Sequence, residues 1–220
     1  MDFFFFDIET CGNYPDFETF KLNDERGSKL FYSKFDKMSW VEKYDSVNDA
    51  YINNSGVIST YGKICCISFG FIDNSDNKQI KSFYGEDEKE IVANFNNLLK
   101  KIETKNFKLS GWRITHFDIP WLLHKLHKYD IVPANIILTY DKKPWEMRIV
   151  DMFEDWKGKF AWSISFDEMC YELEIHSPKT EMNGSQVHEY YWSNRLEEIK
   201  EYCERDVLAC IEASKKIYKK

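Results

Sequence analysis

The sequence predicts an α/β protein in which a mixed central sheet is flanked by helices. Residues 3–8 form a tight apolar run of the kind found in strands that are buried on both faces. Two further strand-like segments follow at 63–73 and 78–84, and apolar residues recur at helical spacing over 86–104 and 194–218. Strands that come first and then alternate with helices are typical of a mixed sheet covered by helices.

The N-terminal part of the chain departs from this regular pattern. Residues 3–8 are interpreted as the first strand, although Asp7 interrupts the apolar run near its end. Residues 11–60 are polar, aromatic and irregular, and we interpret them as an insertion or long excursion of uncertain structure, with short helices near 35–52. Because 220 residues suit one domain, we expect a single domain over 1–220 that contains this insertion.

Each later segment carries its own prediction. The turn sequence DNSDN at 73–77 joins the segments 63–73 and 78–84 into an expected hairpin. The remaining expected elements are a helix over 86–104, a strand over 107–110, a helix over 117–127 with Pro120 in its first turn, a strand over 146–151, a helix over 163–173, a loop over 176–192 that contains Gly184, and a long final helix over 194–218.

Composition and charge limit the classes of protein to consider. The formal net charge of −7 argues against a protein that coats nucleic acid through bulk positive charge. It does not exclude an enzyme that holds a strand end, because bound divalent cations reverse the sign of the field locally. No apolar run is long enough for a bilayer, and no basic region precedes the short hydrophobic stretch at the start, so we expect no membrane partner and no signal peptide. The six cysteines lack metal-binding spacing, which favours reduced thiols in a cytoplasmic protein.

Three short motifs carry acidic residues whose spacing suits metal chemistry. Asp7 and Glu9 lie two apart at the end of an expected strand, so their carboxylates project to the same side and suit a hard cation such as magnesium or manganese. Asp118 opens an expected helix, where the helix dipole alone favours a negative charge. Tyr202 and Asp206 lie four apart and share one face of the final helix. Each motif by itself is more often an ordinary strand end or helix face than a functional site.

In this order and at these separations, the three motifs resemble those of the DEDD superfamily of 3′→5′ exonucleases, which are DnaQ-like proteins with a ribonuclease H-like fold. The DxE motif of that superfamily is matched by residues 7–9. Its second motif ends in Phe-Asp or Tyr-Asp at a helix start and is matched by Phe117 and Asp118. Its third motif, YxxxD, is matched by Tyr202 and Asp206, and this tyrosine marks the DEDDy branch.

The surrounding sequence also resembles the exonuclease domain of family B DNA polymerases and its stand-alone relatives. The segment LSGWRITHFDIPWL is similar to their second motif, and Lys179, Gly184 and Val187 fall in a loop where such relatives carry a lysine and a Gly-Ser/Thr-x-Val stretch. Arg113 replaces the asparagine of that motif. A guanidinium there suits a phosphate, and it equally suits an acidic neighbour in a structural role. For Asp151 we expect a structural role.

The resemblance implies a ribonuclease H-like mixed central sheet and a hydrolytic reaction. The implied cofactors are two divalent cations, Mg²⁺ or Mn²⁺, and the implied partner is the 3′ end of single-stranded nucleic acid, with DNA favoured over RNA. The product would be nucleoside 5′-monophosphates, formed by two-metal-ion hydrolysis. The metal ligands implied are Asp7, Glu9, Asp118 and Asp206. Tyr202 would orient the attacking water, and the implied substrate contacts are Arg113, Phe117 and Lys179.

Two alternatives stay open at this point. Loss of turnover through Arg113 would leave a nucleic-acid-end binding module of the same fold, which would bind strands without cleaving them. A magnesium-dependent nucleotide phosphohydrolase would use the same carboxylates in a closed pocket, and it would cleave mononucleotide esters but not oligomers. The sequence identifies no protein partner, and from its length we expect no palm and fingers domains of a full polymerase.

Overall fold

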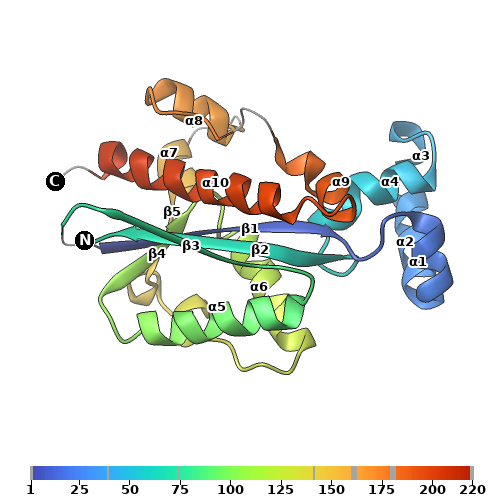
Figure 1. Cartoon of the computed structure of the whole chain (residues 1–220), viewed down its shortest axis with the longest axis horizontal. Helices are drawn as coiled ribbons and strands as arrows, with labels where there is room; N and C mark the ends of the chain where they lie inside the picture. Colours follow the sequence, from blue (N-terminus) through green and yellow to red (C-terminus); the bar gives the residue numbers. More distant parts are fainter. Residues whose placement is uncertain are drawn as a thin grey trace.

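A mixed sheet of five strands, with helices on both faces, forms the body of the molecule in the computed structural model (Figure 1). The structure describes residues 2–38, 40–73, 75–140, 142–159, 163–178 and 182–218. The strands are β1 (Asp2–Gly12), β2 (Gly62–Ile72), β3 (Lys78–Tyr84), β4 (Phe107–Gly111) and β5 (Ile149–Asp151). Their order in the sheet is β3-β2-β1-β4-β5, and the central strand β1 pairs antiparallel with β2 and parallel with β4.

The helices form two layers and one separate group (Figure 1). One face of the sheet is covered by α5 (Glu88–Ile102) and α6 (Asp118–Lys128), and the other by α7 (Met152–Lys157), α8 (Phe166–Glu172) and α10 (Leu196–Ile217). At one end of the sheet lie α1 (Phe17–Asn23), α2 (Glu25–Lys37), α3 (Trp40–Lys43) and α4 (Val47–Asn54), next to α9 (Val187–Trp192). Short 3-10 turns are η1 (Ser55–Val57), η2 (Asn135–Ile137), η3 (Pro144–Glu146) and η4 (Gly184–Gln186).

The apolar run of β1 is buried because its side chains enter cores on both faces of the sheet. Phe4 and Phe6 pack into the core beneath α5 and α6. Phe5 packs against α10 on the opposite face. Burial of each phenylalanine stabilises the fold by about 1.5–3 kcal/mol. Since alternate side chains of a strand point to opposite faces, Asp7 follows Phe5 and faces α10.

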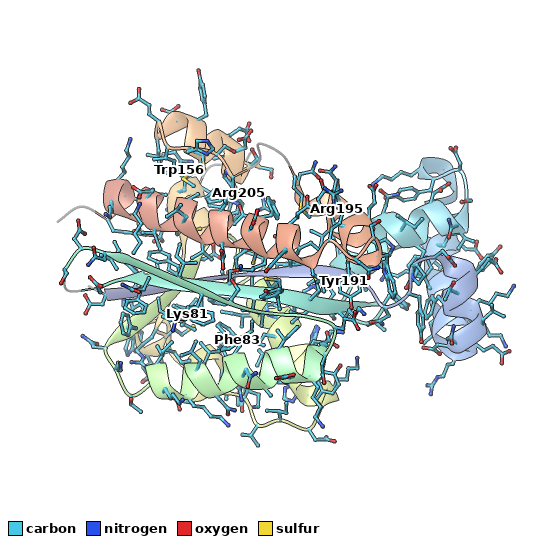
Figure 2. The ribbon with its side chains drawn as sticks, in the orientation of Figure 1. Lys81, Phe83, Trp156, Tyr191, Arg195 and Arg205 are labelled. Carbon is cyan, nitrogen blue, oxygen red and sulfur yellow. The ribbon has the colours of Figure 1, made fainter. Side chains whose placement is uncertain are left out.

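Partly buried aromatic side chains complete both cores. Figure 2 shows Phe83 of β3 on the side of the sheet that α5 covers and Trp156 of α7 on the side of α10, and each packs against the core on its own side. The central strand is therefore packed from above and below, and this fixes the position of the acidic residues that it carries.

The predicted α/β class and mixed sheet are confirmed. The expected hairpin is formed by β2 and β3, which pair antiparallel from Cys66↔Tyr84 to Ile72↔Lys78. The helices predicted from periodicity over 86–104, 117–127 and 194–218 correspond to α5, α6 and α10. These segments have in common a long apolar stripe, which is the most reliable local signal of a helix.

The predicted end of the first strand was wrong. Strand β1 continues to Gly12, because β2 pairs with it as far as Gly62, past a bulge between Glu9 and Thr10. Asp7 and Glu9 therefore lie inside a strand and not at its end. The bulge increases the local twist at the point where the two carboxylates leave the sheet.

Boundaries near the C-terminal half also differ from the predictions. The strand expected over 146–151 is limited to β5, since the side chain of Asp151 accepts a hydrogen bond from Phe153 N and begins α7 there. The helix expected over 163–173 begins later, as α8, where Ser165 and Glu168 form a capping box. The loop expected over 176–192 was wrong in part, because its described residues include η4 and α9.

The insertion is also more regular than the sequence suggested. Asp16, Asp24 and Ser46 accept hydrogen bonds from backbone amides and cap α1, α2 and α4. The helices enclose an aromatic core of their own, which consists of Phe17, Phe20, Phe31, Phe35, Ala50, Tyr51 and Tyr61. The helices are short, so their periodicity was weak in the sequence, and they depend on the packing of these rings for most of their stability.

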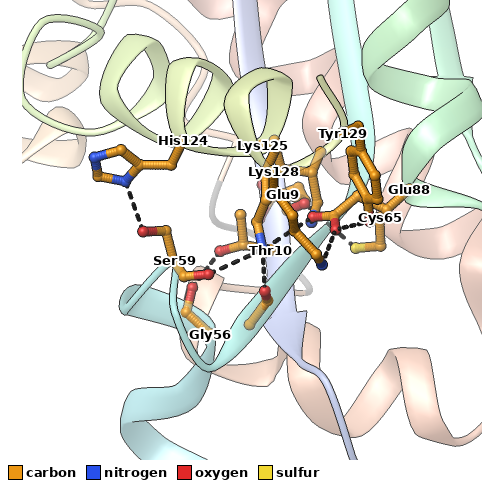
Figure 3. Close-up of polar contacts among 12 residues, drawn as sticks. Glu9, Thr10, Gly56, Ser59, Cys65, Glu88, His124, Lys125, Lys128 and Tyr129 are labelled. Carbon is orange, nitrogen blue, oxygen red and sulfur yellow. Dashed lines mark hydrogen bonds and ion pairs between the residues drawn. The ribbon is translucent and has the colours of Figure 1, made fainter. Parts of the chain in front are cut away.

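A buried polar network holds the end of the insertion to the sheet and to α6 (Figure 3). Lys125 Nζ donates hydrogen bonds to the carbonyl oxygens of Ser59, at 2.9 Å, and Gly62, and it lies 3.3 Å from Glu88 Oε1. Glu88 in turn accepts a hydrogen bond from Ile64 N at 2.7 Å. Burial lowers the pKa of Lys125, and Glu88 opposes this shift. Breaking a buried pair of this kind costs about 3–5 kcal/mol, so the segment is held firmly.

Within the described ranges, no helix combines the length and the apolar character needed to cross a bilayer. All six cysteines are buried and free. The fold is therefore held by its apolar cores and buried polar contacts, without a disulfide between these thiols.

Candidate active site

Four carboxylates gather where β1, α6 and α10 meet. Asp7 and Glu9 come from β1, Asp118 is the first residue of α6, and Asp206 lies in the middle of α10. Glu9, Asp118 and Asp206 are 7%, 3% and 8% exposed, and Asp7 is half-buried. Asp7, Asp118 and Asp206 each raise the pKa of at least one other carboxyl of this group, and all three raise the pKa of Glu9. The structure thus brings together acidic residues that are up to two hundred positions apart in the chain.

Asp118 is positioned by the sheet itself. Its Oδ1 accepts a hydrogen bond from Ile8 N at 3.0 Å, which ties the start of α6 to the strand that carries Asp7 and Glu9. Burial raises the pKa of Asp118 to about 8, and the hydrogen bond from Ile8 opposes this rise. The carboxyl is thus held in place, in a site that disfavours its charge.

The surroundings of the two carboxyls of β1 also disfavour their ionised forms. Burial raises the pKa of Asp7 well above its ordinary value, and Asp206 and Asp118 add to the effect. Burial likewise raises the pKa of Glu9, and Asp7 and Asp206 add to it. Among the described residues, no lysine or arginine forms an ion pair with Asp7, Glu9 or Asp118.

Such a set of oxygen donors suits a hard divalent cation. A bound cation would favour the ionised form of every carboxylate near it and so reverse these shifts. Oxygen-only donors at buried positions are the ligands that Mg²⁺ and Mn²⁺ prefer. The residues present therefore fit the group that the sequence implied.

Cys203 is a site residue that sequence reasoning missed. Its Sγ lies 3.4 Å from both the backbone oxygen and Oδ2 of Asp7. One ligand atom each from Asp7, Glu9 and Cys203 fall within 4.8 Å of one another. Burial raises the pKa of the Cys203 thiol, so the thiol acts as a donor towards Asp7. Its spacing of three residues from Asp206, on the same helix face, was the available signal.

Tyr202 lies beside these carboxylates as the sequence predicted. The side chain is 4% exposed. Burial raises the pKa of the phenol far above its ordinary value, and Asp206, Glu9 and Asp7 add to the effect, with a hydrogen bond to Asp206 among the causes. Tyr202 therefore stays protonated and can donate a hydrogen bond, but it cannot act as a base at neutral pH.

Two pockets lie on either side of the carboxylates. The first, which we call the α10 pocket, has a volume of about 440 Å³ and is lined by Asp7, Trp112, Arg113, Ser163, Ile164, Ser165, Phe166, Glu168, Tyr202, Asp206 and Cys210. The second, the insertion pocket, has a volume of about 270 Å³ and is lined by Ile8, Glu9, Thr10, Ile52, Asn53, Gly56, Val57, Phe117, Gly184, Ser185 and His188. A third cavity of about 450 Å³ lies away from the carboxylates, at the end of the sheet near Asp2 and Tyr218.

Arg113 lines the α10 pocket and adopts an unusual backbone conformation. Its φ is 59°, a left-handed region that asparagine tolerates better than arginine. Arg113 N donates to Asp151 Oδ1 at 3.0 Å, and Asp151 also accepts hydrogen bonds from Thr115, so Asp151 has the structural role expected of it. The guanidinium stacks 3.9 Å from the ring centroid of Phe153 and donates to Ser163 Oγ at 3.0 Å.

The other predicted substrate contacts are placed differently. Phe117 lines the insertion pocket and packs against Trp121, with ring centroids 5.7 Å apart. Lys179 lies outside the described residues. Gly184 borders the insertion pocket, and Val187 is buried at the start of α9.

Comparisons with known proteins show the family and the fold of the chain. Residues 57–211 match the model of a family described as predicted 3′–5′ exonucleases related to the exonuclease domain of PolB. The fold is similar to the family B DNA polymerase from the hyperthermophilic archaeon Pyrobaculum calidifontis, with a TM-score of 0.64 and 11% identity over 99% of this chain. This chain spans 24% of the length of that polymerase. No curated protein matches the chain significantly.

Proposed function

The chain belongs to the family of predicted 3′–5′ exonucleases related to the exonuclease domain of PolB, and from this premise we propose that it removes nucleoside 5′-monophosphates from the 3′ end of single-stranded nucleic acid, with DNA favoured over RNA. The observation that carries the proposal is the cluster of four carboxylates between two pockets, three of them buried and Asp7 half-buried. The family match covers Asp118, Tyr202 and Asp206 but begins after Asp7 and Glu9. The inclusion of Asp7 and Glu9 is supported by their position next to Asp118 and Tyr202 in the structure.

The residues that would hold the cofactors are the four carboxylates. Asp7, Glu9 and Asp206 would bind one divalent cation, Mg²⁺ or Mn²⁺, and Asp7 and Asp118 would bind a second. When bound, two such ions activate water and stabilise the attacking and leaving oxygens of a phosphodiester. Oδ1 of Asp118 accepts the hydrogen bond from Ile8 N, which holds the carboxylate next to β1.

The remaining side chains act on water and substrate. Tyr202, as a buried phenol, donates a hydrogen bond that orients the attacking water. The Cys203 thiol holds the Asp7 carboxylate in one orientation. Arg113, stacked on Phe153, presents its guanidinium to a phosphate of the strand in the α10 pocket. Phe117 offers a ring on which a base can stack.

Cleavage of oligonucleotides labelled at the 5′ end tests this function. Single-stranded DNA and RNA are incubated with Mg²⁺, Mn²⁺ or EDTA, and the products are followed over time. Asp7→Asn and Asp206→Asn proteins run alongside, and the matched control is Asp36→Asn, which changes an exposed aspartate of α2. Circular dichroism melting confirms that each variant is folded.

If the chain has the proposed function, we expect a metal-dependent ladder of labelled products that shortens from the 3′ end. The control variant should retain it, and the two site variants should lose it. The faster substrate distinguishes DNA from RNA. Strand binding without a ladder would support the end-binding module instead, and cleavage of mononucleotide esters alone would support a phosphohydrolase.

A further inference from the structure

The insertion pocket is built from two different parts of the chain. Glu9, Thr10 and Phe117 belong to the sheet and to the start of α6, whereas Ile52 and Val57, together with Asn53 and Gly56, come from α4 and η1 of the insertion. Because the matched family region begins at residue 57, most of this second wall lies outside it. Part of the lining of this pocket therefore comes from the inserted segment.

Direct contacts fix the inserted wall against the central strand. Thr10 Oγ1 donates a hydrogen bond to the carbonyl oxygen of Gly56 (Figure 3). A Cβ at Gly56 would lie 3.1 Å from the carbonyl oxygen of Thr10, so a residue without a side chain is favoured where the two segments approach. Lys125 holds the next turn through the carbonyls of Ser59 and Gly62. The wall is thus a fixed part of the pocket.

A second set of contacts fixes the other end of the insertion. His188 accepts a hydrogen bond from Gly12 N at 3.1 Å through Nδ1, and its Nε2 lies 2.9 Å from the oxygen of Pro15. Tyr51 accepts a hydrogen bond from Tyr14 N at 3.1 Å. Both ends of the inserted segment are therefore tied to the strand that carries Glu9.

The lining of the pocket has two chemical characters. Ile52 and Val57 present apolar side chains that are 36% and 58% exposed and take no part in the aromatic core of the insertion. They share the pocket with Phe117, while Glu9 and Thr10 supply oxygen atoms at the end nearest the carboxylates. Apolar faces with a polar end suit a nucleoside, whose base is flat and apolar on its faces and whose sugar carries hydroxyl groups.

Building on the proposed function, we propose that the insertion forms the specificity-determining wall for the last nucleotide of the strand, with Val57 and Ile52 in contact with its base. The volume of about 270 Å³ is near the lower limit of the roughly 300–1,000 Å³ typical of small-molecule sites, so the pocket admits one nucleotide unit. On this reading, a strand whose phosphate lies at the carboxylates meets the insertion at one end and extends through the α10 pocket at the other. The insertion thereby limits cleavage to a strand end.

Filling the pocket tests this wall without altering the carboxylates. Val57→Trp places a large side chain in the pocket, and Leu22→Trp is the matched control, because Leu22 lies on α1 of the same insertion, is 85% exposed and is outside the pocket lining. The substrates are labelled single-stranded DNA oligonucleotides that end in a normal nucleotide or in an abasic residue.

The wild-type enzyme is expected to prefer the normal end over the abasic end by about tenfold in kcat/KM, as loss of one base contact predicts. Val57→Trp should raise KM for the normal end by about tenfold or more, change kcat less, and abolish the preference for a base. Leu22→Trp should behave as wild type. A merely structural effect of Val57→Trp would lower activity on both ends equally, and that result would overturn the proposal.

These experiments distinguish a failure of the proposed wall from a failure of the proposed exonuclease function. One result is a wild-type ladder together with a Val57→Trp protein that keeps the wild-type preference for a normal over an abasic end. That result would refute the proposed wall and leave the exonuclease assignment intact. If the wild type gives no ladder, binding of deoxyadenosine 5′-monophosphate with Mn²⁺ is measured by calorimetry. Saturable binding that Val57→Trp loses and Leu22→Trp keeps would support the pocket, and absence of binding to the wild type would overturn it.

Discussion

Replacing Asp118 by asparagine is expected to stabilise the metal-free protein at pH 8. Burial raises the pKa of this carboxyl from 3.8 to about 8, and Asp151 and Asp206 add to the rise. Between these two pH values the native state binds more protons than the unfolded chain, so the free energy of unfolding falls as the pH increases. An amide at this position carries no charge and removes that penalty.

The magnitude follows from the shift in proton affinity. One pKa unit corresponds to about 1.4 kcal/mol, so a rise from 3.8 to about 8 sets an upper limit of about 6 kcal/mol at pH 8. We expect about 2–3 kcal/mol in practice, because neighbouring carboxyls share protons and the protein responds with a higher effective dielectric constant. The asparagine Oδ1 can still accept the hydrogen bond from Ile8 N, which is 3.0 Å long in the wild type.

The assay is urea unfolding, followed by tryptophan fluorescence in EDTA at pH 5 and pH 8. Asp118→Asn should be more stable than wild type at pH 8, and the difference should shrink at pH 5. Added Mg²⁺ should stabilise wild type more than the variant, since a ligand stabilises the state that binds it. Asp36→Asn, at an exposed position of α2, is the control and should change the stability by less than about 0.5 kcal/mol. Equal stability of wild type and Asp118→Asn at pH 8 would refute the electrostatic reasoning.

Three further predictions follow from the site and its supports. Tyr202→Phe should lower kcat by about tenfold to a hundredfold in a protein that remains folded, because it removes the buried hydroxyl that orients water, and an unchanged kcat in a steady-state assay would contradict that role. Arg113→Ala should raise KM for DNA and reduce the salt dependence of binding by about one phosphate contact, which fluorescence anisotropy at several salt concentrations measures; an identical slope would argue for a purely structural arginine. Lys125→Met should lower the free energy of unfolding by about 3–5 kcal/mol, because it leaves Glu88 buried without this lysine, whereas the exposed Lys29→Met should have little effect in the same urea titration.

The sequence by itself determined the parts of the site that depend on local spacing. Asp7 and Glu9 share a strand face because side chains alternate, and Tyr202 and Asp206 share a helix face because a helix repeats every 3.6 residues. The long apolar stripes fixed the main helices for the same reason. Where periodicity was short or interrupted, as at residues 11–60 and 176–192, the chain gave too weak a signal to show its helices.

Only the tertiary structure decided which of these separate residues meet. No local rule places Asp118 within hydrogen-bond distance of Ile8 N, because that contact spans 110 residues and depends on how β1 and β4 pair. The same holds for Cys203 beside Asp7, and for Val57 and Phe117, which line the same insertion pocket. Spacing along the chain encodes the direction of a side chain, whereas long-range packing sets its neighbours, its exposure to water and hence its pKa.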